Sequence, residues 1–256
     1  MIDLNENLKI SRYLDLTKLL DFIQFDRLYF RQVDKYDDVF EGSFPKIIYE
    51  LAKSITITGN DGVSTNKGIT ETTKLIRQST YVSCWTANDS ESMAMWNLYG
   101  GKNGLCIHTN TSIVMEELLK APHKNNEKSS TILRLISPRV SRIRYVDHLK
   151  SDIDFNAVEI SDYPIIYKNI GFSYEDEIRF FYDMRQQSNA DLPKEFGEGF
   201  HLSIDSKSII EKVLVSPSAD YGFFDNVKKL LSHSGLENRV EWSSLKNPPY
   251  KESEFF

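Results

Sequence analysis

Two short segments, separated by about 90 residues, carry the side chains best suited to chemistry. The first, Tyr81–Thr86, is an apolar strand pattern with a hydroxyl at Ser83, and Met95–Tyr99 follows it closely. The second, Tyr174–Phe181, opens with three acidic residues and continues into a bulky strand. A carboxylate at the mouth of that strand, Glu177, is placed where it can point into a cleft. The pairing indicates an enzyme site.

Carboxylate chemistry is the reaction type that these residues favour. Strand periodicity places Glu175, Glu177 and Arg179 on one face, with apolar residues on the other. Closely spaced carboxylates raise one another's pKa or hold a cation. A Glu in a cleft can stabilise a cationic transition state, such as an oxocarbenium ion at a ribose carbon. The alternative is a strand edge with solvated charges, paired to a basic strand at residues 142–144.

Other side chains are suited to holding a ligand. Arg12, on the first predicted strand, matches a diphosphate because its planar guanidinium makes bidentate contacts. The alternative for Arg12 is a solvated surface cation. Ser83 can hydrogen-bond to a ligand or to its neighbours. The rings of Trp85, Trp96 and Tyr99 can stack on a flat heteroaromatic ring or pack in the core.

Motifs for other chemistries are missing from the sequence. The five histidines are scattered and form no i,i+4 pair, which gives no support for a metal site. There is no Gly-x-Ser-x-Gly elbow, Walker loop or Gly-x-Gly-x-x-Gly run. Two rivals to a metal-free enzyme remain open. One is a noncatalytic sensor or interaction module, and the other is a nuclease that uses Asp38, Glu41, Glu175 and Glu177 around a divalent metal.

Composition limits the class of protein. The chain has 256 residues, 40% hydrophobic and 27% charged, as is ordinary for a globular protein. The formal net charge of −6 argues against tight nonspecific duplex binding, which needs a cationic surface. Cys84 and Cys106 lie in apolar strand patterns and are expected to be buried free thiols. The sequence shows no signal peptide and no membrane-spanning run, so we expect a cytoplasmic protein with no membrane partner.

Hydrophobic periodicity predicts one α+β domain over residues 1–256, with a split, mainly antiparallel sheet flanked by helices. Asn88, with Glu91 three residues later, predicts a capped helix that stops at Gly100. The other predicted helices follow Asp15 or cover 45–53, 70–78, 112–120 and the region from Phe224 to Leu231. Predicted strands cover 9–13, 27–31, 80–86, 104–109, 139–146, 177–182, 197–204, 209–215 and 239–242.

Several blocks resemble a bacterial family, domain of unknown function 2971. The family opens with a Lys/Arg-Tyr strand, a Leu-Tyr-Phe-Ser strand and an Asn-Asp-Pro-Phe-Glu loop. Its later blocks read Ser-Cys-Phe-Ser-Glu, Met-Trp-x-x-Tyr, Gly-x-Cys-Ile and Tyr-x-x-Glu-x-Glu-x-Arg. Val39 replaces a preferred Pro and Thr86 a frequent Ser. The matching residues span nearly the whole chain: Arg12–Tyr13, Leu28–Phe30, Asp37–Gly42, Ser83–Thr86, Met95–Tyr99, Gly104–Ile107, Tyr174–Arg179 and Ile210–Pro217.

The order of elements is also similar to the ADP-ribosyltransferase fold, which is a fold-level analogy. In that fold a first-strand Arg or His contacts NAD, a Ser supports the nicotinamide ribose, and a late Glu orients that ribose and the nucleophile. The resemblance assigns these roles to Arg12, Ser83 and Glu177, with Glu175 assisting the acceptor. It also implies that Tyr13, Tyr29, Trp85 and Tyr99 help to bind NAD.

This resemblance implies a transferase that consumes NAD as a substrate and needs no metal. The reaction would cleave the nicotinamide–ribose bond and pass ADP-ribose to a protein or nucleic-acid acceptor, or to water. Such enzymes are similar to bacterial toxins and phage-defence effectors, so a cognate antitoxin or inhibitor protein is an expected partner. The resemblance also predicts that Arg12, Ser83 and Glu177 converge on one cleft.

Overall fold

Short strands and capped helices alternate along the chain, for which the computed structural model describes residues 7–54, 66–87, 90–123, 133–150, 164–186 and 196–246. The chain divides into two compact units. The first unit contains residues 1–2, 29–84 and 125–201, and the second contains 3–28, 85–124 and 202–256. Three strands cross this division along the chain: β2 (Arg27–Gln32), β3 (Thr80–Thr86) and β9 (Gly199–Ser203).

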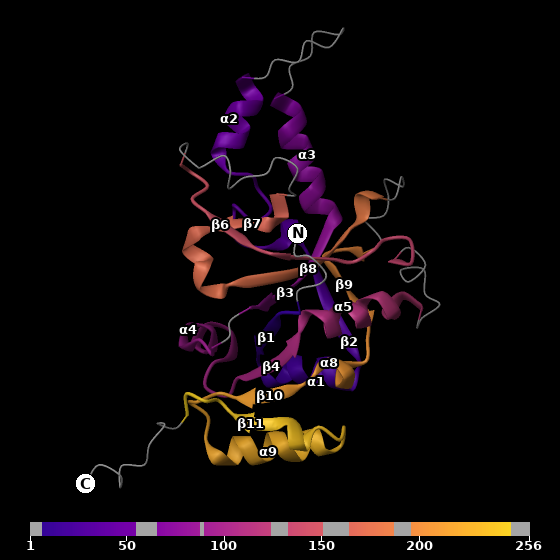
Figure 1. Ribbon diagram of the computed structural model, residues 1–256, viewed down its shortest axis with the longest axis vertical. Helices are drawn as coiled ribbons and strands as arrows, with labels where there is room; N and C mark the ends of the chain where they lie inside the picture. The colour runs from indigo at the N-terminus through magenta and orange to yellow at the C-terminus, as the bar shows by residue number, and fades with distance from the viewer. Residues whose placement is uncertain are drawn as a thin grey trace, which may run out of the picture. The chain divides into compact units, whose positions relative to one another are not determined.

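The first unit is built around β8, which antiparallel pairing joins to β5 with Val140 opposite Phe180. β8 also pairs with β3, and β3 pairs with β2 in antiparallel fashion. The helices α2 and α3 lie side by side (Figure 1). The elements of this unit are η1 (Val33–Lys35), α2 (Lys46–Ser54), α3 (Asn66–Ser79), β5 (Arg139–Arg142), β6 (Arg144–Val146), η5 (Pro164–Ile166), β7 (Tyr167–Asn169), η6 (Ile170–Glu175), β8 (Glu177–Asp183) and η7 (Met184–Gln186).

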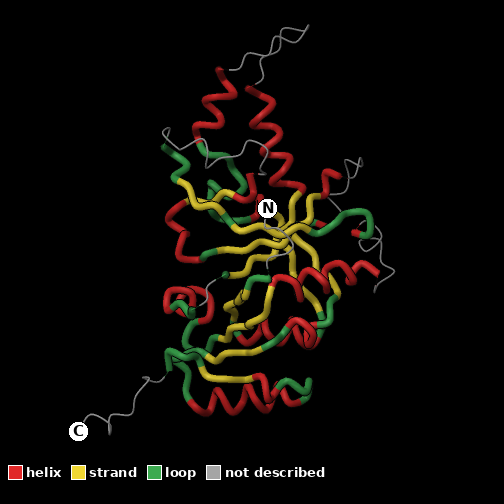
Figure 2. Tube along the Cα trace, viewed as in Figure 1, coloured by secondary structure: helices red, strands yellow, loops and turns green. Residues whose placement is uncertain are grey.

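The second unit contains a strand layer in which β10 pairs antiparallel with β4 and β4 with β1, while β10 and β11 are parallel. The helix α9 lies along β11 (Figure 2). Asp15 caps α1 by accepting a 2.8 Å hydrogen bond from the Lys18 amide. The elements are β1 (Lys9–Leu14), α1 (Leu16–Gln24), α4 (Met93–Met95), the π-helical turn η2 (Trp96–Gly100), β4 (Leu105–Asn110), α5 (Thr111–Lys120), η3 (Ala121–His123), α8 (Ser206–Ile209), β10 (Lys212–Val215), α9 (Tyr221–Ser232), η8 (Glu237–Arg239) and β11 (Val240–Trp242).

Each unit has its own apolar core. All seven residues of β8 are buried, and Phe181 joins a cluster in the first unit with Ile76, Val82 and Ile165. Burying each of these side chains stabilises the fold by about 1.5–3 kcal/mol relative to exposure. Trp96 is the largest member of the corresponding cluster in the second unit. Because β8 is buried on both faces, any charge that it carries must be neutralised within the protein.

The predicted class is confirmed: the chain is mixed α/β with a mainly antiparallel arrangement of strands. The likeness to ADP-ribosyltransferases and the single domain remain predictions. The predicted strand 139–146 is divided at Ile143 into β5, which pairs with β8, and β6, which pairs with β7. The three-residue strand β7, which pairs with β6, was not predicted.

The predicted helix cap at Asn88 is wrong in position. Asn88 lies outside the described residues, and the helix α4 begins after Ser92, whose hydroxyl accepts from the Met95 amide. Glu91 makes no capping box. Its carboxylate instead accepts from the Trp96 indole at 3.0 Å and from the Ser244 amide at 2.6 Å. The capping pattern is local, whereas these two partners of Glu91 are set by tertiary packing.

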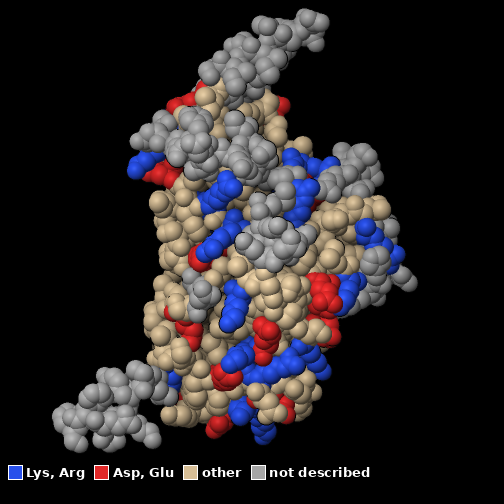
Figure 3. All heavy atoms as spheres, in the orientation of Figure 1, with Lys and Arg blue, Asp and Glu red and all other residues tan. Residues whose placement is uncertain are grey.

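The surface carries charges of both signs. On the face shown in Figure 3, Lys and Arg side chains lie next to Asp and Glu side chains. This mixture agrees with the modest formal charge of −6. Within the described ranges, every helix is too short or too polar to cross a membrane.

Candidate functional site

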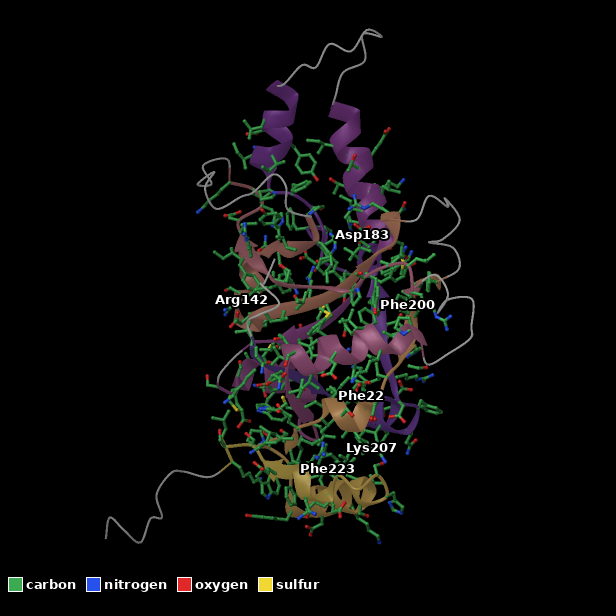
Figure 4. The ribbon with its side chains drawn as sticks, turned by 45° about the vertical axis from the view of Figure 1, so that its right-hand side comes forward. Phe22, Arg142, Asp183, Phe200, Lys207 and Phe223 are labelled. Carbon is green, nitrogen blue, oxygen red and sulfur yellow. The ribbon has the colours of Figure 1, made fainter. Side chains whose placement is uncertain are left out.

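Glu177 begins β8 directly after a tight turn. Asp176 occupies the left-handed region at φ 39°, which Asp tolerates better than most residues. Arg142 on β5 holds this turn, since its Nη2 donates to both Asp176 carboxylate oxygens over 2.7 and 2.8 Å. Figure 4 labels Arg142 near this end of β8 and Asp183 near the other. The Glu177 amide donates to the Tyr145 hydroxyl over 2.8 Å, so the turn and the strand fix the start of the Glu177 side chain.

The guanidinium of Arg179 has a partner for each of its five N–H donors. Nε donates to Glu177 Oε1 over 2.5 Å, and Nη2 donates to Glu177 Oε2 over 3.1 Å. Nη2 also donates to Glu41 Oε2 over 3.0 Å, and Nη1 donates to Glu41 Oε1. The remaining donor reaches the Ile165 carbonyl over 2.7 Å. Arg179 is completely buried, and this set of partners compensates for its lost hydration.

Lys168 on β7 joins the two predicted catalytic carboxylates. Its ammonium donates to Glu177 Oε2 over 2.9 Å and also to Glu175 Oε2. The same nitrogen lies 4.9 Å from the centre of the Phe172 ring, within range of a cation–π contact. One cation therefore holds Glu175 and Glu177 together.

These five side chains form an ionic centre, defined as Glu41, Lys168, Glu175, Glu177 and Arg179. Each is buried, with the exposed fraction of Lys168 the largest at 7%. Its three carboxylates and two cations give a formal charge of −1 when all five are ionised. All five residues belong to the first unit.

The electrostatics of the centre keep Glu177 ionised. Burial raises the pKa of Glu177, but Arg179 and Lys168 outweigh it, and the pKa falls to about 2. Burial lowers the pKa of Lys168, yet Glu177 and Glu175 hold it well above its usual range. Burial also lowers the pKa of Arg179, but the charges of Glu177 and Glu41 outweigh burial and raise this pKa well above its usual value. At neutral pH the cations therefore stay protonated and Glu177 stays anionic.

A thiol completes the surroundings of Glu177. Cys84 on β3 makes a side-chain hydrogen bond with Glu177, and the Tyr36 hydroxyl lies 3.5 Å from its sulfur. Burial, and secondarily the charge of Glu177, raises the pKa of the Cys84 thiol to about 12. Cys84 is thus a neutral thiol beside an ionised carboxylate. Ser83 is one position earlier on β3 and takes the opposite face of that strand.

Stability alone is a poor explanation for this arrangement. Replacing a buried ion pair by well-packed apolar residues is often neutral or stabilising. A core of apolar side chains would therefore be at least as stable as this buried centre of five charged residues. Clusters of buried groups with shifted pKa values occur preferentially at functional sites, although structural networks also produce them. The ionic centre is therefore the strongest candidate site in the first unit.

One alternative for the carboxylates is wrong and another is weakened. The strand 139–142 does pair with β8, and Arg142 does bind an acidic residue, but Glu175 and Glu177 are buried and do not form a solvated edge. Three of the four carboxylates of the nuclease alternative are bonded to Lys or Arg. Among the described residues, no group of three His, Cys, Asp or Glu side chains could hold a metal ion.

Comparison with known protein families gives a match over the part of the chain that carries most of this centre. Residues 95–180 match the family described as protein of unknown function, DUF2971. The resemblance predicted from the sequence is confirmed over this stretch. A search of the curated proteins and a search of the solved structures found no match.

The DUF2971 stretch contains four members of the ionic centre: Lys168, Glu175, Glu177 and Arg179. Glu41 and Cys84, which bond to members of this group, come from outside the matched residues. The matched residues thus include most of the paired charges around β8.

Several of the predicted ligand residues, among them Arg12, Tyr13 and Tyr99, belong to the second unit. The guanidinium of Arg12 lies over the Trp85 ring, 5.6 Å from its centre. Tyr13 packs edge-on against Trp96 with ring centres 5.0 Å apart, and its hydroxyl accepts from the Ser92 amide over 3.1 Å. Trp85 is buried, whereas Tyr99 is 45% exposed. Tyr99 is thus the predicted stacking residue with the most open ring.

The remaining predicted residues belong to the first unit. Tyr29 packs against His201 with ring centres 4.9 Å apart and is partly exposed. Ser83 is buried on β3. Glu175 and Glu177 are brought together, and so are Arg12 and Trp85. The convergence of Arg12, Ser83 and Glu177 on one cleft stays a prediction, because Arg12 belongs to the second unit.

Lys168, a member of the ionic centre, and the contact of the neighbouring Cys84 with Glu177 were not predicted from the sequence. Lys168 follows the apolar run Pro164–Tyr167, but a lysine is usually exposed, so this position gives no local signal of a buried, paired cation. Cys84 was predicted to be a buried thiol, but it is only partly buried, and nothing in its strand pattern indicated the contact with Glu177.

Proposed function

We propose that the chain is an NAD-dependent, ADP-ribosyltransferase-like enzyme. It cleaves the nicotinamide–ribose bond and modifies a protein or nucleic-acid acceptor, in the manner of a bacterial toxin or phage-defence effector. One observation carries the proposal: a carboxylate that stays ionised, Glu177, lies in a buried centre with a formal charge of −1. A site of this kind favours a transition state that gains positive charge.

Cleavage of the nicotinamide–ribose bond develops positive charge, which the net negative charge of the ionic centre can stabilise. As the nicotinamide–ribose bond breaks, its electron pair leaves with nicotinamide, and positive charge develops on the ribose. An acceptor oxygen or nitrogen then bonds to the ribose carbon and loses its proton. A fixed carboxylate in poorly hydrated surroundings stabilises that charge more than water does. Glu177 takes this role and Glu175 assists the acceptor.

The proposal requires a local rearrangement. Glu177 is 2% exposed, and both of its carboxylate oxygens accept hydrogen bonds. A ribose can contact it only by replacing a present partner. Lys168 is the candidate for displacement, because its ammonium lies where two carboxylates already stabilise one positive charge. Arg179 stays and keeps Glu177 ionised.

Nicotinamide release tests the proposal. The purified protein is incubated with NAD, with protein and nucleic-acid acceptors present, and nicotinamide is quantified. Glu177→Gln should reduce turnover by at least about 100-fold while sparing NAD binding, and Glu175→Gln should cost less. EDTA should have no effect.

Glu116→Gln is a matched control. Glu116 is 66% exposed and pairs with Lys120 on α5, so turnover should stay at the wild-type rate. Unfolding curves for each variant separate lost chemistry from lost structure. The absence of nicotinamide release from the wild type, relative to a heat-inactivated sample, would overturn the proposal.

A specific observation favours a second candidate, a noncatalytic ligand- or partner-binding module. Every N–H donor of Arg179 is satisfied, and Glu177 is buried by its own unit. In that case the ionic centre only holds loop 37–42 and β7 against β8. Glu177→Gln would then lower stability in a protein that never releases nicotinamide.

A further inference from the structure

The first unit has a pocket with no lining residue in the ionic centre. Its volume is about 420 Å³, within the range of about 300–1,000 Å³ typical of small-molecule sites. Most of its lining comes from α3, and the rest from η1, α2 and the loop between them. The lining residues are Asp34, Ser43, Tyr49, Thr70, Thr73, Lys74, Arg77 and Gln78.

Two lining residues carry buried polar atoms that lack a hydrogen-bond partner within the described part of the chain. These atoms are Arg77 Nε and Asp34 Oδ1. A buried donor or acceptor left unsatisfied costs about 1–3 kcal/mol, so such atoms need an explanation. Arg179 belongs to the same unit, and in contrast to Arg77 all five of its N–H donors have partners. Both atoms are closed to solvent as they stand, so a ligand in the pocket that accepts from Arg77 and donates to Asp34 supplies both missing partners once these two side chains turn toward it.

Gly42 leaves room for the side chain of Arg77 beside the pocket. Gly42 has a φ of 66°, and a Cβ added there would lie 2.9 Å from Arg77 Cγ and 2.7 Å from Val33 Cγ1. Any larger residue would therefore move the stem of Arg77. The loop that sends Glu41 to Arg179 thus also admits Arg77 beside the pocket.

The chemistry of the lining defines the ligand. Lys74 and Arg77 supply two positive charges and Asp34 one negative charge, which suits an anionic group next to a hydrogen-bond donor. The hydroxyl groups come from Ser43, Tyr49, Thr70 and Thr73. A lining rich in hydroxyls complements a polyhydroxylated molecule better than an apolar one.

We propose that this pocket binds a small sugar phosphate. Its phosphate contacts Arg77 and Lys74, and one of its sugar hydroxyls donates to Asp34. The guanidinium fork of Arg77 matches a phosphate, while Lys74 adds a point charge. This site is independent of NAD turnover, so a failure of the enzyme proposal leaves it unaffected.

Calorimetric titration of the full chain with ribose 5-phosphate tests the site, with ribose and inorganic phosphate as comparison ligands. We expect ribose 5-phosphate to bind, inorganic phosphate to bind more weakly, and ribose alone to give no measurable heat. Arg77→Gln should weaken binding by roughly 10–100-fold, the equivalent of one charge-assisted hydrogen bond. Asp34→Asn should reduce the preference for ribose 5-phosphate over inorganic phosphate.

Two further variants distinguish a loss of ligand binding from a loss of folding. Lys74 is exposed, so Lys74→Gln should weaken phosphate binding while leaving the unfolding midpoint unchanged. Lys46→Gln is the matched control, because Lys46 is an exposed lysine on the adjacent helix α2 and does not line the pocket. It should bind ribose 5-phosphate as the wild type does.

Three results would overturn the proposal. The first is no binding of ribose 5-phosphate to the wild type at millimolar concentration. The second is equal affinity in the wild type, Lys74→Gln and Arg77→Gln. The third, equal affinity for inorganic phosphate and ribose 5-phosphate, would remove the sugar from the assignment.

Discussion

Glu41 and Arg179 lie 138 residues apart in the sequence and form a two-armed ion pair, in which Arg179 Nη2 donates to Glu41 Oε2 over 3.0 Å. The pair ties the loop after η1 to the middle of β8. Because Arg179 also holds Glu177, the loop residue Glu41 is coupled to the candidate catalytic carboxylate through a single guanidinium.

Glu41→Gln should be strongly destabilising. The change leaves the buried guanidinium of Arg179 without its second negative partner, and breaking a buried pair in this way costs about 3–5 kcal/mol. Urea unfolding measures the difference. Arg142→Gln is the control: it removes a half-exposed pair with Asp176 and should cost no more than about 1 kcal/mol. A similar, small loss in both variants would show that the buried pair contributes no more than a surface pair.

The low pKa of Glu177 predicts a defined acid sensitivity. The folded pKa is about 2 and the ordinary value is 4.5, so below pH 4.5 the unfolded state binds the proton more readily. The stabilisation, about 3 kcal/mol, is complete above pH 4.5 and is lost as the pH falls toward 2. Between pH 5 and pH 3 the wild type should lose about 2 kcal/mol more unfolding free energy than Glu177→Gln. Parallel pH profiles for the two proteins would contradict the assignment.

The sequence pattern predicts part of the ionic centre. Period-two alternation places Glu177 and Arg179 on one face of β8, and their hydrogen bonds confirm it. The partners of this pair were not predictable, because Glu41 and Lys168 reach it through tertiary packing that leaves no local signal. Burial was also unexpected. Acidic residues at a strand entrance usually face water, and here cations from other segments compensate for the lost hydration.

Helices and strands were predicted where their signals are local. The Asp15 cap and the apolar spacing after it correspond to α1, and the alternation of residues 27–31 corresponds to β2. The short strand β7 escaped prediction because three residues carry too little periodicity. Its only notable residue is Lys168, whose meaning depends on Glu175 and Glu177.

The Cys84 thiol should be unreactive in the folded protein. Its pKa of about 12, against an ordinary 9.0, reduces the thiolate at a given pH by about 1,000-fold. Burial is the main cause, so unfolding should restore reactivity. Iodoacetamide labelling at pH 8, followed by peptide mapping, should show slow modification of Cys84 in buffer and rapid modification in urea. Labelling of native Cys84 at the rate of a free thiol would mean that it is accessible and weakly shifted.

The last prediction concerns Arg12 and depends on the proposed NAD chemistry. A diphosphate carries its charge in the ground and transition states alike, so an Arg that contacts it contributes mostly uniform binding. Arg12→Ala should therefore raise the KM for NAD more than it lowers kcat, and Arg12→Lys should restore only part of the loss, because an ammonium lacks the bidentate fork. The competing role of Arg12 is structural, a cation–π contact with the Trp85 ring. In that case removing the guanidinium would lower the unfolding free energy by roughly 0.5–1 kcal/mol and leave kcat and KM unchanged. Measuring kcat, KM and unfolding free energy for both variants separates the roles. Unchanged kinetic constants together with reduced stability would assign Arg12 to packing and remove it from the NAD site.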